Sequence, residues 1–198
     1  MHRGPLAFPG QRIGLLGGSF DPPHGGHLHI TKRAMKAVGL DAVWWLVSPG
    51  NPLKENGPAD IERRVQACRA MIDHPRVHVT DIERNFGSPY TANTLWRLSR
   101  RYPGVRFIWL MGADNLASFH RWEDWQWIIE TYPICALARP GDQVRAGLSP
   151  AAQRYANTRV RASEAARLGR GGLPGWCLLT GPMSDQSSTR LRADGLWA

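Results

Sequence analysis

Short apolar runs alternate along this chain with segments whose apolar residues recur every three or four positions. The short runs are rich in β-branched and aromatic residues, which predicts strands at 12–16, 42–48, 77–80, 105–111, 133–138 and 176–180. The helical spacing predicts helices over 28–38, 61–72 and 90–100, with shorter helices at 122–130 and 187–193. Strands that alternate with helices predict an α/β fold with a doubly wound, mostly parallel, Rossmann-like sheet.

Single residues predict where some of these helices begin and end. Asp60 is suited to cap the start of the helix over 61–72, and Thr91 is suited to cap the helix over 90–100. Gly39 is expected to end the first helix, because glycine tolerates the left-handed backbone found after many helices.

The length of 198 residues is that of one domain. We expect a single domain over 1–198, with residues 1–11 as an N-terminal extension. Residues 141–173 have weak periodicity and many glycine, arginine and alanine residues, which predicts an irregular or flexible segment, either a poorly packed loop or short helices. Hydrophobic residues make up 42% of the chain, enough for a core, and nine tryptophans predict that aromatic rings fill much of it.

The cellular compartment is suggested by what the chain lacks. No apolar stretch reaches membrane-spanning length, and residues 1–11 lack the apolar region of a secretory signal, so we expect a cytoplasmic protein. The odd number of cysteines and their wide separation argue against a disulfide framework or a zinc site. We therefore interpret Cys68, Cys135 and Cys177 as small buried apolar residues. Four histidines have no partner at metal-ligand spacing and are interpreted as surface or core residues: His29, His74, His78 and His120.

The formal net charge of +9 suits a polyanionic partner, either a nucleic acid or a nucleotide with several phosphates. Much of the excess lies between positions 139 and 170, where seven arginines are accompanied by two acidic residues. These arginines are scattered, and such a stretch is typical of a solvated surface. The charge therefore does not decide between the two kinds of partner.

The run Gly-Gly-Ser-Phe-Asp-Pro-Pro-His-Gly-Gly-His, from Gly17 to His27, is the most informative part of the chain. A strand precedes it and a helix follows, so its glycines and the helix N-terminus form a candidate phosphate cradle. His24 and His27 are three residues apart, and both rings can therefore face one phosphate chain. The run matches neither the dinucleotide nor the triphosphate glycine fingerprint, and it contains no lysine. The alternative is a tight turn with two solvated histidines.

A second candidate lies near the end of the chain, at Ser187-Ser188-Thr189-Arg190-Leu191-Arg192. Hydroxyl groups at a helix start can cap the helix and also donate to phosphate oxygens, and Arg192 adds a planar charged fork about one turn later. The alternative is an ordinary capped amphipathic helix.

Both strings resemble the signatures of the nucleotidyltransferases that carry a His-x-Gly-His motif. Between them, several stretches are similar to those of the nicotinate mononucleotide adenylyltransferases. These stretches are Pro49-Gly50-Asn51-Pro52-Leu53-Lys54, residues 81–84, Ser88 to Leu95, Met111-Gly112-Ala113-Asp114-Asn115, Trp122 and Ala138-Arg139-Pro140-Gly141. The resemblance runs from about position 12 to position 193, and it departs from the family pattern at Pro89 and at Gly25, where many relatives carry asparagine.

This resemblance implies adenylyl transfer from ATP to nicotinate mononucleotide, giving deamido-NAD and pyrophosphate in NAD biosynthesis. It implies catalytic roles for His24, His27 and Arg192. The implied ATP-binding residues are Gly17, Gly18, Ser19, Phe20, His24, His27, Asp114, Ser187, Ser188, Thr189 and Arg192. Mg²⁺ is expected as a cofactor bound mainly through the ATP phosphates, with no metal held by a protein cluster.

The same resemblance implies a nicotinate mononucleotide site formed by Lys54, Tyr90, Thr91, Trp122 and Arg139. Four of these five residues also have a structural interpretation: Lys54 and Arg139 as solvated surface charges, Thr91 as a cap, and Trp122 as a core residue. Asp114, on the ATP side, has the structural alternative of a turn acceptor.

Two other functions stay open at this point. The chain is alternatively another nucleotidyltransferase that acts on phosphopantetheine or uses CTP, or a basic nucleic-acid-binding protein suggested by its charge alone. We expect ATP and nicotinate mononucleotide as partners, with no nucleic acid and no membrane. The oligomeric state and the choice between the acid and amide forms of the pyridine are left open.

Overall fold

The computed structural model describes residues 4–50, 57–138, 142–170, 175–180, 188–193 and residue 197. Within these residues, six strands form one all-parallel sheet in the order β3-β2-β1-β4-β5-β6. The strands are β1 (Arg12–Gly18), β2 (Ala42–Val47), β3 (Val77–Thr80), β4 (Arg106–Gly112), β5 (Ile134–Leu137) and β6 (Trp176–Leu179). The predicted doubly wound sheet is confirmed, and each predicted strand is present within two residues at either end.

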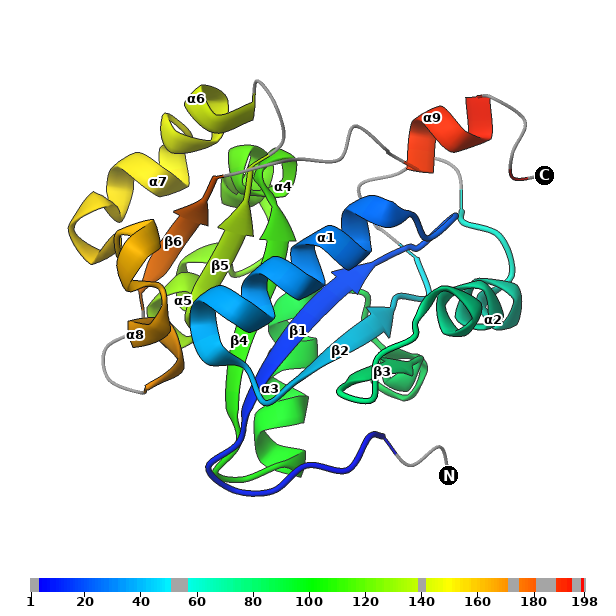
Figure 1. Ribbon diagram of the computed structural model, residues 1–198. Coiled ribbons are helices and arrows are strands. Elements are labelled where there is room, and N and C mark those ends of the chain that lie inside the picture. The colour runs from blue at the N-terminus through cyan, green and yellow to red at the C-terminus, as the bar shows by residue number, and fades with distance from the viewer. Residues whose placement is uncertain are drawn as a thin grey trace.

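Helices cover both faces of the sheet, as Figure 1 shows. One face carries α1 (Gly25–Ala34), α2 (Ile61–Met71) and α8 (Ala166–Gly169). The other face carries α3 (Thr91–Arg101), α4 (Ala113–Ser118), α5 (Trp125–Thr131), α6 (Asp142–Gly147) and α7 (Pro150–Arg154). A last helix, α9 (Ser188–Ala193), lies at the edge of the sheet where β1 ends.

Strand β2 shows why the strand sequences are almost entirely apolar. Its alternate side chains enter the two opposite clusters, so that Trp44 packs under α3 and Trp45 packs under α1. Both rings are completely buried. A strand covered on both faces has no solvent-facing positions, and its sequence therefore reads as a continuous apolar run. The prediction of a tryptophan-rich core is confirmed by these residues together with Trp109 and Trp176.

The order of the strands places a crevice between β1 and β4. The chain leaves β1 for α1 on one face, and it leaves β4 for α4 on the other face. Such a reversal opens a crevice beyond the carboxyl ends of the two strands, where ligands of open α/β sheets bind. Gly18 and Gly112, the last residues of these neighbouring strands, therefore mark where a ligand site is expected.

Two of the predicted helix ends are confirmed. The Asp60 carboxylate accepts hydrogen bonds from the amides of Glu62 and Arg63, at 3.0 and 3.2 Å, and so caps α2. Gly39 has a φ angle of +74° and ends the π-helical turn that follows α1.

The predicted cap of α3 is wrong. Tyr90 occupies the cap position and has no side-chain cap hydrogen bond, while Thr91 is already the first helical residue. The Ser88 hydroxyl accepts from the Tyr90 amide at 3.3 Å instead. Pro89 lies between them, and a proline disfavours helical backbone angles at the residue before it, so that Ser88 stays outside the helix.

The predicted helix over 122–130 and the turn considered for Asp114 are also corrected. Trp122 ends a 3-10 turn over Phe119–Arg121, and α5 begins only at Trp125 because Asp124 has a φ angle of +51°. Directly after β4, the chain forms α4 instead of a simple turn. The apolar pattern did not indicate the break before α5, because the aromatic residues on both sides of Asp124 pack into the same cluster.

The segment from 142 to 170, for which we expected a poorly packed loop or short helices, holds the short helices α6, α7 and α8. It is packed, because its small apolar side chains are buried against the sheet: Ala146, Ala151, Ala152, Ala165 and Leu168. The three cysteines are buried, as predicted, and the Cys177 thiol donates to the Cys135 sulfur at 3.6 Å. Within the described ranges, no helix has the length and apolar character needed to cross a bilayer.

A buried acid lies between β3 and α3. Glu83 is 8% exposed, and its carboxylate accepts a hydrogen bond of 2.8 Å from the Thr94 hydroxyl. Burial raises the pKa of Glu83 to about 7, since the charged form loses its hydration, and the Thr94 hydrogen bond only partly offsets this effect.

We expect the Glu83→Gln variant to become more stable relative to the parent as the pH rises. Between 4.5, its ordinary pKa, and about 7, the folded protein holds the Glu83 proton while the unfolded chain has lost it. The parent therefore loses stability with rising pH through this group, by up to about 3 kcal/mol. Urea unfolding of both proteins at about pH 5 and about pH 8 measures this difference. Parallel pH dependence in the two proteins would contradict it.

Candidate active site

The glycine turn after β1 leaves no room for side chains at its start. A Cβ atom at Gly17 would lie 2.5 Å from the ring of Trp109, which extends from the neighbouring strand β4. Phe20 has a φ angle of +48°, an uncommon conformation for a residue with a side chain. The backbone therefore passes close to the end of the sheet and turns sharply before α1 begins.

His24 and His27 cap the first turn of α1 reciprocally. The Nδ1 atom of His24 accepts from the Gly26 amide, and the Nδ1 atom of His27 accepts from the His24 amide, both at 3.1 Å. An imidazole whose Nδ1 accepts carries its proton on Nε2 when it is neutral. Both rings therefore present a defined donor on the side away from the backbone. Their centroids are 3.9 Å apart, as the prediction of one shared face requires.

The ring of His27 is held in an aromatic cluster. It lies 4.6 Å from the ring of Phe20 and 5.8 Å from that of Trp45, and these two rings stack on each other at 5.0 Å. The indole of Trp45 donates to the Thr31 hydroxyl on α1 at 2.8 Å. The cluster thus fixes both the helix and its second histidine against β2.

The closing serine-rich segment reaches the opening glycine turn. The Ser188 hydroxyl donates to the Pro22 carbonyl at 2.8 Å, across 166 positions of the sequence. The Arg192 guanidinium donates to the Asp21 carbonyl and lies 3.7 Å from the Asp21 carboxylate. These contacts bring the two candidate phosphate-binding motifs together, and Figure 1 shows α9 beside the start of α1.

Trp197 adds a contact that the sequence did not predict. Its indole donates to the Asp21 carboxylate at 2.7 Å, and its ring lies 4.1 Å under the Arg63 guanidinium. Asp21 is 8% exposed and so receives partners from two points of the C-terminal segment. No periodicity or motif marks a lone tryptophan at this position, and a contact between distant segments is its only signal.

Arg64 is a second residue that sequence reasoning missed. It is 1% exposed, and its guanidinium donates to the carbonyls of Ser19, Ser48 and Ala59. A signal was present, because position 64 lies three residues after Ile61 and four before Cys68 on the apolar stripe of α2. A charged residue on an apolar stripe marks either a break in the pattern or a buried polar contact.

On the β4 side of the crevice, Gly112 leaves space for the carboxylate of Asp114, which folds back over it. Asp114 is exposed in the first turn of α4, next to the carboxyl end of β1. Trp122 is half-buried and meets Trp109 edge to face at 6.2 Å. Because Trp109 also touches the Gly17 position, one indole separates the glycine turn from Trp122.

The other predicted site residues lie at the start of α3 or outside the described residues. Tyr90 and Thr91 begin α3, on the face of the sheet opposite α1, and Tyr90 is 43% exposed. Lys54, Arg139 and Ser187 lie outside the described residues, as does the side chain of Thr189. Among the residues that the structure does describe, no group of three or more His, Cys, Asp or Glu side chains is placed to hold a metal ion.

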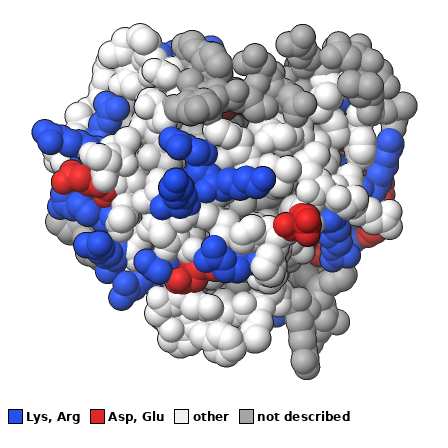
Figure 2. Space-filling model, in the orientation of Figure 1, with Lys and Arg blue, Asp and Glu red and all other residues white. Residues whose placement is uncertain are grey.

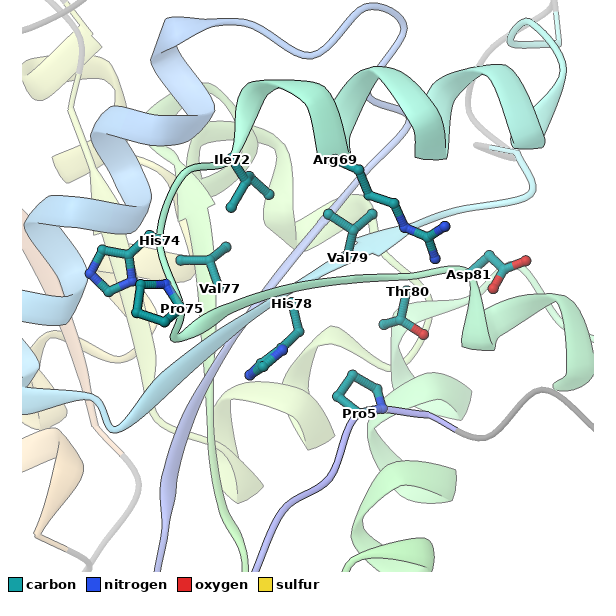
Figure 3. Close-up of a pocket in the computed structure, with 10 residues that line it drawn as sticks. All are labelled: Pro5, Arg69, Ile72, His74, Pro75, Val77, His78, Val79, Thr80 and Asp81. Carbon is teal, nitrogen blue, oxygen red and sulfur yellow. The ribbon is translucent and has the colours of Figure 1, made fainter.

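The surface charge and one pocket are the remaining features of interest. Figure 2 shows more Lys and Arg than Asp and Glu on the face that carries α1, a distribution that attracts polyanions. A pocket of about 410 Å³ lies at the edge strand β3. Figure 3 shows the residues that line it, which include His78 and Asp81. None of the predicted site residues lines this pocket.

Comparisons with known proteins agree with this geometry. The family model described as cytidylyltransferase-like matches residues 15–194. A probable nicotinate-nucleotide adenylyltransferase of Ruegeria pomeroyi is 59% identical over 194 residues, which cover 98% of this chain and 91% of the relative. A protein of the same name from Cereibacter sphaeroides is 60% identical over 185 residues, covering 93% and 98%. The fold is also similar to that of the Plasmodium falciparum nicotinic acid mononucleotide adenylyltransferase solved in complex with NaAD, with a TM-score of 0.71 at 14% identity, covering 92% of this chain and 83% of that chain.

The fold and the site define a nucleotidyltransferase, and the chain belongs to the cytidylyltransferase-like family with the His-x-Gly-His motif. The resemblance seen in the sequence is therefore confirmed. Within this family, the identity over nearly the whole chain places it among the nicotinate-nucleotide adenylyltransferases, enzymes of NAD biosynthesis.

Proposed function

We propose that this enzyme transfers the adenylyl group of ATP to nicotinate mononucleotide, giving deamido-NAD and pyrophosphate, at the crevice between β1 and β4. A phosphate oxygen of the mononucleotide attacks the α-phosphorus of ATP in line. The bond between that phosphorus and the oxygen that bridges the α and β phosphates breaks, and pyrophosphate leaves with the electron pair. The nucleophile is already an anion, so catalysis consists of positioning the reactants and stabilising the charge that develops on oxygen.

His24 and His27 supply donors to the phosphates in this proposal. Their Nδ1 atoms are occupied by the cap of α1, so each neutral ring donates through Nε2. The backbone amides near Ser19 and Phe20, and the N-terminus of α1, add further donors to the α and β oxygens. Because the cap fixes both rings before ATP arrives, little ordering is left for the moment of reaction.

Ser188 and Arg192 hold the leaving pyrophosphate in this proposal, together with Ser187 and Thr189. Arg192 uses one donor on the Asp21 carbonyl. A guanidinium has five N–H donors in a planar fork, so Arg192 can keep this anchor and still bind a phosphate. The position of α9 against the glycine turn then places this charge near the leaving group.

Mg²⁺ belongs to this proposal as a cation carried mainly by the ATP phosphates and water. The only carboxylate in the glycine turn, Asp21, is engaged by Trp197 and Arg192, which fits a cation held by its substrate. When bound, Mg²⁺ neutralises charge on the phosphates and usually keeps several of its waters. Asp114, beside the crevice, is suited to accept hydrogen bonds from the ribose hydroxyls of ATP.

The mononucleotide occupies the β4 side of the crevice in this proposal. Trp122 offers a partly exposed ring for stacking with the pyridine. At the start of α3, the Thr91 amide and hydroxyl are proposed to bind the pyridine carboxylate, with Tyr90 beside them. Lys54 and Arg139 are proposed to neutralise the phosphate of the mononucleotide.

The observation that carries this function is the contact of Ser188 and Arg192 with the glycine turn, because it joins both phosphate-binding motifs in one place. The test is a pyrophosphate-release assay of the purified protein with Mg²⁺ and either ATP or CTP. The acceptors are nicotinate mononucleotide, nicotinamide mononucleotide and phosphopantetheine. Release with ATP and nicotinate mononucleotide supports the proposal, and release only with phosphopantetheine or CTP contradicts it.

We expect Trp122→Ala to weaken the binding of nicotinate mononucleotide about 10-fold and that of ATP by less than about 2-fold, since the lost stacking concerns the pyridine alone. The KM values for both substrates measure this. Trp127→Ala is the matched control, because Trp127 is an exposed tryptophan of α5 with no role in the proposal. An equal effect on both substrates would assign Trp122 to the core only.

A further inference from the structure

Arg64 is a charged residue at a position of α2 where the packing environment favours an apolar side chain. It lies on the buried face of α2 between Ile61 and Cys68, and it is 1% exposed. Burial lowers the pKa of the Arg64 guanidinium, and the negative charge of Asp21 partly opposes this. An arginine nevertheless stays charged at neutral pH, because its ordinary pKa is far above it. Burying a charge is costly, so a guanidinium at this position is expected to serve contacts that an apolar side chain cannot make.

The contacts of Arg64 join three backbone segments at the carboxyl edge of the sheet. Its Nη1 donates to the Ser19 carbonyl at 2.6 Å and to the Ser48 carbonyl at 2.8 Å. Its Nε donates to the Ala59 carbonyl at 2.6 Å. Ser48 also binds the turn directly, since its amide donates to the Gly18 carbonyl at 3.0 Å. The glycine turn is thus fastened to the end of β2 and to the start of α2 through one side chain.

The bond to Ser19 also sets the direction of an amide in the turn. The Ser19 carbonyl and the Phe20 N–H belong to one planar trans peptide, in which they point in opposite directions. With the carbonyl held by Arg64, the Phe20 N–H points away from α2. A hydrogen bond from a charged donor also polarises the peptide, which makes its N–H a stronger donor.

We propose that Arg64 is a positioning residue for the nucleotide: it aims and polarises the Ser19–Phe20 peptide so that the Phe20 N–H donates to a phosphate oxygen of ATP. This role rests on the proposed function. The turn itself contains no lysine or arginine, and Arg64 supplies a positive charge to it from the side of α2. It also accounts for the φ angle of +48° at Phe20, because the peptide before this residue is held in place from outside the turn.

The kinetic test compares Arg64→Met and Arg64→Lys with the parent and with Arg69→Met. Arg69 is the control because it lies on the exposed side of the same helix. We expect kcat/KM for ATP to fall about 10- to 100-fold in Arg64→Met, as for a slightly misplaced reactant, while KM for nicotinate mononucleotide changes by less than about 3-fold. Lysine keeps the charge without the fork, so Arg64→Lys is expected to recover about a third or less of the parent value. Melting temperatures ensure that each variant is assayed while folded.

A direct readout separates this role from a structural one. In protein labelled with ¹⁵N-phenylalanine, five backbone amide signals are expected, and a Phe20→Leu variant identifies that of Phe20. We expect ATP with Mg²⁺ to shift the Phe20 signal in the parent and in Arg69→Met, and to shift it by less than about half as much in Arg64→Lys. If Arg64→Met does not fold, Arg64→Lys decides the question.

Each outcome has one meaning. An unchanged Phe20 response, or equal losses for ATP and nicotinate mononucleotide, overturns the role of Arg64. A parent enzyme that releases pyrophosphate with none of the acceptors overturns the proposed function instead. An active parent whose Arg64 variants keep normal ATP kinetics overturns the role of Arg64 and leaves the proposed function intact.

Discussion

Replacing His27 with alanine lowers the turnover number about 100- to 1000-fold and leaves the fold in place, as expected when one preorganised donor to a developing oxyanion is removed. The His27 ring is fixed by the His24 amide and by the rings of Phe20 and Trp45, so its Nε2 donor is oriented before substrate binds. We expect a stability cost of about 1 to 3 kcal/mol, because the variant loses one helix-cap contact and the ring contacts with Phe20 and Trp45.

Two further variants divide the role of His27 into its parts. The side chain of His27→Asn can accept from the His24 amide in place of Nδ1 but does not reach the position of Nε2, so it should fold normally and stay inactive. His27→Gln carries an amide donor near the position of Nε2 and should recover part of the turnover. His29→Ala, on the same helix, is the matched control. The turnover number and the melting temperature of each variant test this order, and near-normal turnover in His27→Ala would remove the mechanism.

Replacing Arg192 with methionine is expected to lower kcat/KM for ATP about 100-fold or more, because the leaving pyrophosphate loses a charged fork. Arg192→Lys is expected to restore only part of this loss, since an ammonium group binds phosphate as a point charge. Steady-state kinetics with ATP as the varied substrate measure both variants.

Asp21→Asn distinguishes the phosphate role of Arg192 from its anchoring role. This change removes the charge that faces Arg192 at 3.7 Å, but it keeps the Asp21 carbonyl and an acceptor for the Trp197 indole. We expect kcat/KM for ATP to change by less than about 5-fold, since the two charges are 3.7 Å apart, beyond hydrogen-bond distance, and Arg192 keeps its bond to the Asp21 carbonyl. If Asp21→Asn is as harmful as Arg192→Met, Arg192 acts only by holding α9 in place.

The sequence predicted the elements of the fold well, because each one is encoded locally. Buried parallel strands such as β2 need apolar residues at every position, and the apolar run is therefore visible without any knowledge of partners. The cap of α2 at Asp60 was predicted for a similar reason, since a carboxylate acts on amides only two and three residues away. Predictions that depended on the neighbours of a residue were less successful, as at Thr91 and Trp122.

The site residues also differ in how far along the chain their partners lie. The glycines and histidines from Gly17 to His27 act through the turn and helix that they themselves form, so their spacing alone indicated a phosphate cradle. Arg64 acts on carbonyls 16 and 45 positions away, and Trp197 acts on a carboxylate 176 positions away. Neither distance leaves a periodic mark in a single chain.

The order of residues along the chain was thus sufficient for the α/β class, for most strand and helix ends, and for locating the two strings that we propose to bind phosphate. Folding in three dimensions decided that Ser188 and Arg192 lie on the glycine turn, that Trp109 separates this turn from Trp122, and that a buried Arg64 holds the Ser19 carbonyl. The reason is physical. Turn geometry, helix caps and apolar periodicity arise from residues a few positions apart, whereas a buried charge finds its partners only when the strands and helices have packed.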